Sequence, residues 1–167
     1  MAAIASGAAV GAASGVAGAA AMAAASKVEQ LVTGRPSSYV PARTLARLLR
    51  LPDADDDRWG RNMAMHYLAG ASAGAVRGVM AASNLRGPFA SLMHANVRLS
   101  FDQILENATG VGAPPWTWPR AELLVDLSHK ALYALVTGVL SDTLVAPSAS
   151  SSARRRRLPG VRMRRRA

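Results

Sequence analysis

The chain contains no cysteine. This absence excludes disulfide bonds, thiolate metal sites and cysteine nucleophiles. Aromatic residues are scarce, at 5% of the sequence, and alanine supplies much of the 50% that is hydrophobic. A water-soluble core built from such small side chains would bury little apolar area per residue. Small residues favour helix association in a bilayer, where packing drives assembly, so the composition favours a membrane helical bundle.

Sequence motifs for catalysis are also missing. The chain has no HExxH motif, no Ser-His-Asp ordering and no glycine-rich phosphate loop. Its histidines are His66, His94 and His129, which lie in separate segments and do not have the spacing of a metal-binding motif. We therefore expect no enzymatic activity, no bound metal and no cofactor.

Acidic residues are half as numerous as basic ones, and the net charge is +10. The excess lies in the Arg-rich segment Arg154–Arg166, without which the chain is close to neutral. We expect residues 148–167 to form a disordered basic tail. A cytoplasmic tail that orients the protein is one interpretation, and binding of anionic lipid is another. Nucleic acid is a less favoured partner, because no aromatic residue interleaves with the arginines to stack on bases.

Two apolar segments carry glycines spaced four residues apart. Residues 63–83 and residues 2–26 are both long enough to span a bilayer. Small residues at this spacing form a flat stripe along which helix backbones approach closely in lipid. We expect these stripes to mediate helix packing and self-association, which makes a homo-oligomer a candidate assembly. The glycines are Gly7, Gly11, Gly15, Gly70, Gly74 and Gly78.

At 167 residues the chain has room for one domain. We expect an all-α fold, a small transmembrane bundle over residues 1–147 with three to four membrane helices. For the first helix a cleavable signal peptide is the alternative, although the basic n-region and the leucine-rich h-region are missing. The expected helices are residues 3–26, 62–84, 88–108 and 121–146, with a polar connector at 27–61.

The connector contains a short basic amphipathic segment. Arg43, Arg47 and Arg50 fall on one helical face, and leucines lie largely on the other. Such a helix can lie on a membrane surface and attract anionic lipid. An ordinary solvated connector helix is the alternative interpretation.

Residues 88–108 carry a charged or titratable side chain every fourth residue, at His94, Arg98, Asp102 and Glu106. A central charge opposes insertion by about 2.5–3.5 kcal/mol, whereas a large apolar residue favours it by only about 0.3–0.6 kcal/mol. This helix therefore either lies at the interface or packs into the bundle with its charges inward. The basic connector and tail would share one side of the membrane only in the first arrangement, which has three spans; a compact bundle favours four.

The most specific polar pattern is in the last helix, where Asp126, His129 and Tyr133 share one face. Such a trio serves as a clasp between helices, as a ligand or ion site, or as a proton relay. Arg77, within the second helix, needs an acid, and we expect Asp126 or Asp102 to be its partner. The candidate buried polar residues are His66, Arg77, Arg98, Asp102, Glu106, Glu122, Asp126, His129 and Tyr133.

The order of these segments resembles a family of small, mostly uncharacterised four-helix membrane proteins common in high-GC bacteria. The resemblance rests on an Ala/Gly-rich first helix, the motif Gly34-Arg-Pro-Ser-Ser-x-Val40-Pro, and Asp126-x-x-His129-x-x-x-Tyr133 in the last helix. It implies membrane residence and a four-helix fold, and no particular activity. The charged third helix and the arginine tail depart from the family pattern.

Three functions remain open from the sequence. The first is a structural or accessory membrane protein that self-associates. The second is a transporter or channel-like unit for ions, protons or small solutes, using the buried charges. The third is a peripheral helical protein that binds anionic polymers through its tail.

Overall fold

The computed structural model describes residues 1–52 and 58–146, and this part of the chain is all-α, as predicted. The predicted tail, 148–167, lies outside the described residues. The elements are α1 (Ala2–Thr33), α2 (Val40–Leu49), α3 (Arg58–Ala82), α4 (Gly87–Ala108), the 3₁₀ turn η1 (Pro115–Thr117) and α5 (Arg120–Leu144).

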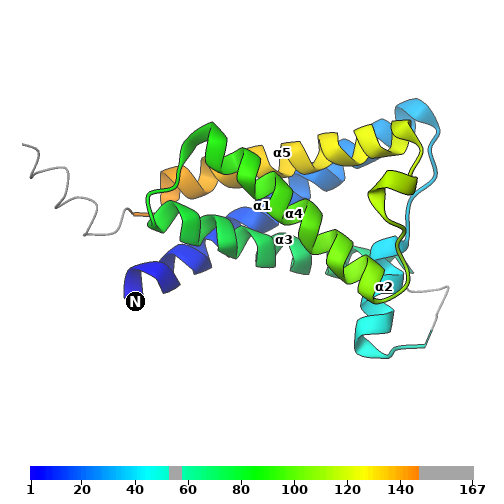
Figure 1. Cartoon of the computed structure of the whole chain (residues 1–167), viewed down its shortest axis with the longest axis horizontal. Helices are drawn as coiled ribbons and strands as arrows, with labels where there is room; N and C mark the ends of the chain where they lie inside the picture. Colours follow the sequence, from blue (N-terminus) through cyan, green and yellow to red (C-terminus); the bar gives the residue numbers. More distant parts are fainter. Residues whose placement is uncertain (53–57, 147–167) are drawn as a thin grey trace, which may run out of the picture.

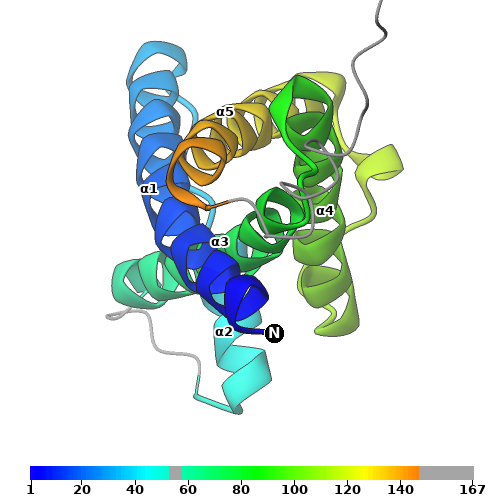
Figure 2. The same cartoon turned by 90° about the vertical axis from the view of Figure 1, so that its left-hand side faces the viewer.

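The four long helices α1, α3, α4 and α5 run up and down in chain order (Figure 1). The start of α1, the α3–α4 turn and the end of α5 lie at one end of the bundle, which we call the terminal end. The short helix α2 and η1 lie at the other end, the connector end (Figure 1). Viewed along the bundle, α3 lies between α1 and α4, and α2 projects below them (Figure 2).

Local sequence signals account for most helix boundaries. The first helix continues to Thr33 rather than ending at residue 26, and it stops at Gly34, whose φ of 71° is left-handed and whose N–H bonds to the Gln30 carbonyl. Glycine is the residue that adopts this cap without strain. Helix α3, which corresponds to the helix predicted at residues 62–84, begins earlier, at Arg58. Prolines occupy the first turn of α2 and of α4, where a missing N–H is harmless.

The two glycine stripes face each other within one chain. A Cβ atom added to Gly78 would lie 2.7 Å from the Gly11 Cα, and one added to Gly15 would lie 2.8 Å from the Gly74 Cα. The backbones of α1 and α3 are therefore in direct contact, as small residues allow. Within one chain each stripe is covered by the other; self-association of the protein stays a prediction.

The interior of the bundle combines small apolar residues with large polar side chains, and large apolar side chains lie on its outer surface. The largest fully buried side chains are Arg77, Tyr133, His94, Thr44, Thr137 and Ser141. The buried apolar residues are mostly alanines, whereas large apolar side chains are exposed on every long helix. Examples are Val16, Leu68, Val76, Phe89, Leu92, Ile104, Leu135 and Val139. This distribution is the reverse of that in a water-soluble protein, in which Leu, Ile, Val and Phe fill the core.

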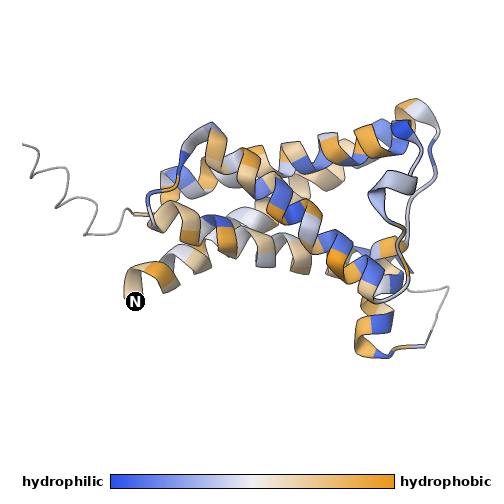
Figure 3. Ribbon diagram, viewed as in Figure 1, coloured by the Kyte–Doolittle hydropathy of each residue, from blue (hydrophilic) through white to orange (hydrophobic). Residues whose placement is uncertain are grey.

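Hydropathy along the ribbon agrees with this pattern. Most of α1 is pale to orange, while blue residues interrupt α4 and the first half of α5 (Figure 3). Two helices, α1 and α5, are long and apolar enough to cross a membrane. The charges of α4 point inward, because His94 and Arg98 are buried whereas Phe89 and Leu92 are exposed. In the structure α4 packs into the bundle with these charges inward; whether it crosses the bilayer stays a prediction.

Candidate functional site

Two histidines that the sequence analysis singled out form hydrogen bonds to backbone carbonyls of neighbouring helices. The Nε2 atom of His66 on α3 lies 2.9 Å from the Ala19 carbonyl oxygen of α1, and the Nε2 atom of His94 on α4 lies 2.9 Å from the Ala73 carbonyl of α3. Because a carbonyl only accepts, each imidazole carries its proton on Nε2. These two residues therefore hold helices together.

Tyr133 makes a third bond of this kind. Its hydroxyl donates to the Gly70 carbonyl of α3 at 2.6 Å. The guanidinium carbon of Arg98 lies 5.2 Å from the centre of the Tyr133 ring, and the His94 ring lies 5.4 Å from it. Tyr133 thus connects α5 to both α3 and α4.

At the terminal end, Arg77 pairs with Asp142. The Nη2 atom of the fully buried Arg77 lies 2.8 Å from Asp142 Oδ1, and the backbone N–H of Gly87 donates to Asp142 Oδ2 at 2.8 Å. Arg86 donates to the carbonyls of Asp142 and Val145. These contacts fasten the α3–α4 turn to the end of α5.

The prediction that Arg77 pairs with Asp126 or Asp102 is therefore wrong. Asp142 lies near the C-terminal end of α5, whose second half is mostly apolar, and not in the polar first half that carries Asp126. The available signal was its position four residues after Gly138, a buried glycine on the face of α5 that packs inward.

A second ion network lies in the middle of the bundle. Arg98 Nη2 is 3.3 Å from Asp102 Oδ1, and Lys130 Nζ is 3.5 Å from Asp102 Oδ2. Lys130 also bonds to Asp126 one turn earlier on α5. Arg98 and Lys130 are buried, so two cations are balanced by two carboxylates. Sequence reasoning found three members of this network and did not select Lys130.

A cavity of about 460 Å³ with a mixed polar and apolar lining opens beside this network at the connector end. Its wall is built from α1, the connector, α3, α4, the α4–α5 loop and α5. Five predicted residues meet there, namely His66, Glu106, Glu122, Asp126 and His129, together with Arg35 and Lys130. Arg77 does not, since it belongs to the terminal end.

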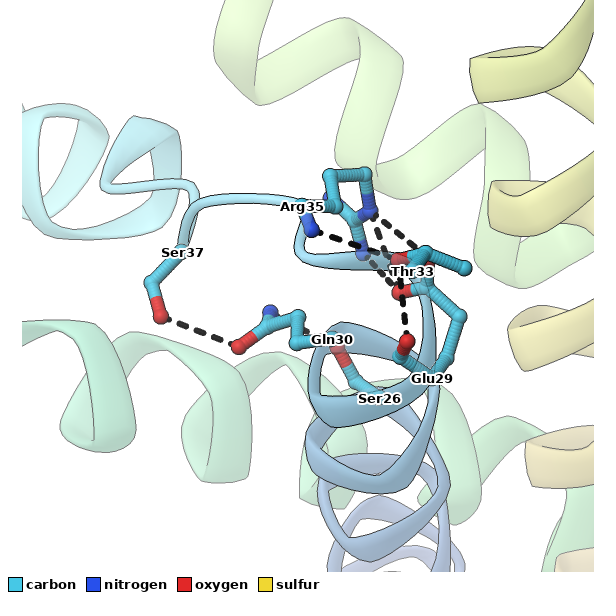
Figure 4. A network of polar contacts seen from close by, with 6 residues as sticks. All are labelled: Ser26, Glu29, Gln30, Thr33, Arg35 and Ser37. Carbon is cyan, nitrogen blue, oxygen red and sulfur yellow. Dashed lines mark hydrogen bonds and ion pairs between the residues drawn. The ribbon is translucent and has the colours of Figure 1, made fainter.

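The connector wall of the cavity is held by an ion pair at the end of α1 (Figure 4). Arg35 Nη2 lies 2.6 Å from Glu29 Oε2, and its Nε lies 3.0 Å from the same oxygen. The hydrogen bond to Glu29 raises the pKa of Arg35. Thr33 also donates to Glu29, while Ser37 donates to Gln30 at 3.0 Å. The chain that follows α1 is thereby folded back on its last two turns.

Within residues 1–52 and 58–146, no group of three His, Asp or Glu side chains is arranged to hold a metal ion. No family model, curated protein or solved structure matches this chain.

Proposed function

We propose that the protein is a multi-pass integral membrane protein in which α1, α3, α4 and α5 cross the bilayer. The observation that carries this proposal is the reversed distribution of side chains, with charges inside and large apolar residues outside. In lipid such a surface is solvated by acyl chains, and interior charges are tolerated when they are paired. Four crossings are also what the family resemblance implies.

Residues at the connector end support this placement. Trp59 and Trp116 are exposed there, and tryptophans are enriched at membrane–water interfaces. The arginines of α2, at Arg43, Arg47 and Arg50, are exposed, while Leu45 packs on α3. We place α2 at the membrane surface with these arginines near anionic lipid headgroups.

The function that this architecture supports best is the binding of a small polar or charged solute in the connector-end cavity, as part of a transporter or channel-like unit. Its volume of about 460 Å³ is within the usual range for small-molecule sites, about 300–1,000 Å³. The cavity carries both carboxylates and cations, and it adjoins the network of Arg98, Asp102 and Lys130.

A structural role is the second candidate. It is favoured by the bonds of His66, His94 and Tyr133 to neighbouring backbones, because those contacts hold helices and leave no group free for a substrate. The two functions differ in one measurable property, which is solute movement.

Membrane integration is tested by alkaline carbonate extraction of membranes from cells that express the tagged protein. We expect the protein to stay in the pellet, since a bundle with an apolar outer surface is not released by high pH. Release into the supernatant would contradict the proposal. The exposed leucines would then have to be surfaces for contact with other helices in a protein that does not span the membrane.

Solute handling is tested by ion and proton flux in liposomes that contain the purified protein. We expect a flux that Asp126→Asn abolishes, because this carboxylate lies on the cavity wall and bonds to Lys130. Ser128→Ala is the control, since Ser128 is an exposed polar residue on the same helix that does not line the cavity. Absence of flux for the wild-type protein would favour the structural role.

A further inference from the structure

A small chamber lies inside the bundle next to the connector-end cavity. It is lined by residues of α2, α3 and α4, and about 20 Å³ is available to the centre of a water molecule. Thr44, His66, Arg98, Asp102 and Glu106 contribute its polar lining. The chamber and the cavity share His66 and Glu106 as a common wall.

Two of the residues around this chamber have hydrogen-bonding atoms that no described residue satisfies. The Oγ1 atom of Thr44, a fully buried residue, has no partner in the described part of the chain. The same holds there for the Nε and Nη1 atoms of Arg98, which is 3% exposed. A buried donor without a partner costs about 1–3 kcal/mol, and more when it is charged, so both residues favour a polar occupant.

The chemistry of the lining selects the occupant. The Arg98 guanidinium only donates, the carboxylates of Asp102 and Glu106 accept, and the Thr44 hydroxyl does both. A single anion would be attracted by Arg98 but repelled by the two carboxylates, whereas water can accept from one side and donate to the other. A volume of about 10–15 Å³ for its centre is enough to hold one water, and the chamber offers about 20 Å³.

We propose that this chamber binds one water molecule, held by the Thr44 hydroxyl and the Arg98 guanidinium, which links Glu106 on the cavity wall to the buried ion network. Arg98 bonds to Asp102, and Asp102 lies beside Lys130. The water therefore extends a hydrogen-bonded chain from the solvent-filled cavity to the centre of the bundle. This site depends on the fold alone and is occupied whether or not the protein moves a solute.

Radiolytic labelling in H₂¹⁸O tests the proposal, because hydroxyl radicals formed from a bound water oxidise the side chains next to it. Met65 lines the chamber but not the cavity, Met22 lines the cavity but not the chamber, and both are 8% exposed. Met22 is thus a matched internal control. The protein is labelled at full length in detergent micelles, and ¹⁸O incorporation into each methionine is measured by mass spectrometry.

We expect Met65 to be labelled in the wild-type protein and to lose most of its label in Thr44→Val, which removes the hydroxyl but keeps the side-chain volume. Thr44→Ser keeps the hydroxyl and should retain the label, and Met22 should be labelled equally in all three proteins. An unlabelled Met65 in the wild type would mean that the chamber is dry and would overturn the proposal. Equal labelling of Met65 in wild type and Thr44→Val would show that the Thr44 hydroxyl does not hold the water. If Thr44→Val does not fold, the wild-type result still decides whether water is present.

Discussion

A buried guanidinium is stable only where a carboxylate and neutral acceptors match its charge. Arg77 has one carboxylate, Asp142, and that carboxylate is itself held by the backbone N–H of Gly87. Removing one partner of such a pair leaves a charge without compensation. The exposure of the two side chains is unequal, since Arg77 is fully buried whereas Asp142 is 21% exposed. Loss of the carboxylate should therefore be the more damaging change.

We predict that Asp142→Asn lowers the free energy of unfolding by about 3–5 kcal/mol, the usual result of leaving a buried charge unpaired. Adding Arg77→Met to this variant should restore part of the loss, because the unpaired charge is then gone. The measurement is denaturant unfolding in detergent micelles, with Glu122→Gln as a control at an exposed carboxylate. Equal stability of wild type and Asp142→Asn would contradict the assigned pair.

The hydroxyl of Tyr133 supports a smaller prediction. Tyr133→Phe keeps the ring near Arg98 but removes the bond to Gly70. We expect a loss of about 0.5–1.7 kcal/mol, the range found for single polar contacts between membrane helices. Tyr39→Phe is a matched control, because it also removes a tyrosine hydroxyl from a ring that lies near an arginine. The guanidinium carbon of Arg58 is 6.0 Å from the centre of the Tyr39 ring. The same unfolding measurement applies, and equal losses in both variants would argue against a clasp.

At the scale of helices, the contact between α1 and α3 depends on residues without a side chain. A Cβ on Gly11 would lie 2.5 Å from the Gly78 Cα, closer than two carbons can approach without moving a backbone. The contact is a continuous strip, because the two helices run antiparallel and their glycines recur at the same interval of four residues.

We predict that Gly11→Ala separates α1 from α3 and costs about 1–3 kcal/mol of unfolding free energy, as overpacking of a filled interface does. Ala13→Val is the control, because Ala13 lies on the exposed side of the same helix, where a larger side chain meets no other helix of the bundle. If both substitutions had the same small effect, the two backbones would not be in contact in the membrane.

At the scale of the whole molecule, the order of the helices fixes which loops share a side. The connector and η1 lie at one end, and the α3–α4 turn lies at the other (Figure 1). We predict that single cysteines placed by Ser37→Cys and Thr117→Cys react with an impermeant maleimide from one side of the membrane. Ser83→Cys, in the α3–α4 turn, should react only from the other side.

The wild-type chain has no cysteine, so it gives no background in this assay. Detergent solubilisation is the second control, because it should make all three positions reactive. Reaction of Ser83→Cys and Thr117→Cys from the same side would show that α4 does not cross, and would restore the arrangement with three spans.

Hydropathy and helix signals were enough to predict the all-α fold and the approximate position of each long helix. They did not predict that α1 continues to Thr33, because Lys27 and Glu29 are compatible both with a helix and with a polar connector. They also did not give the partner of Arg77, since the offset between α3 and α5 follows from packing and cannot be read from either helix alone. Four of the five predicted residues that line the cavity, all except Glu122, are half-buried polar positions of the kind that periodicity detects. Glu122 was predicted to be buried but is exposed, because it lies in the first turn of α5.

The pair of Arg77 and Asp142 also bears on how the protein is made. The two residues are 65 positions apart, so α3 leaves the ribosome well before α5. At that moment Arg77 has no carboxylate, and a central arginine opposes insertion by about 2.5–3.5 kcal/mol. If the four long helices cross the bilayer as proposed, α3 should remain at the translocon until α5 arrives, and a nascent chain that stops before α5 should leave α3 outside the lipid. Assembly of this bundle is completed only when its last helix has been synthesised.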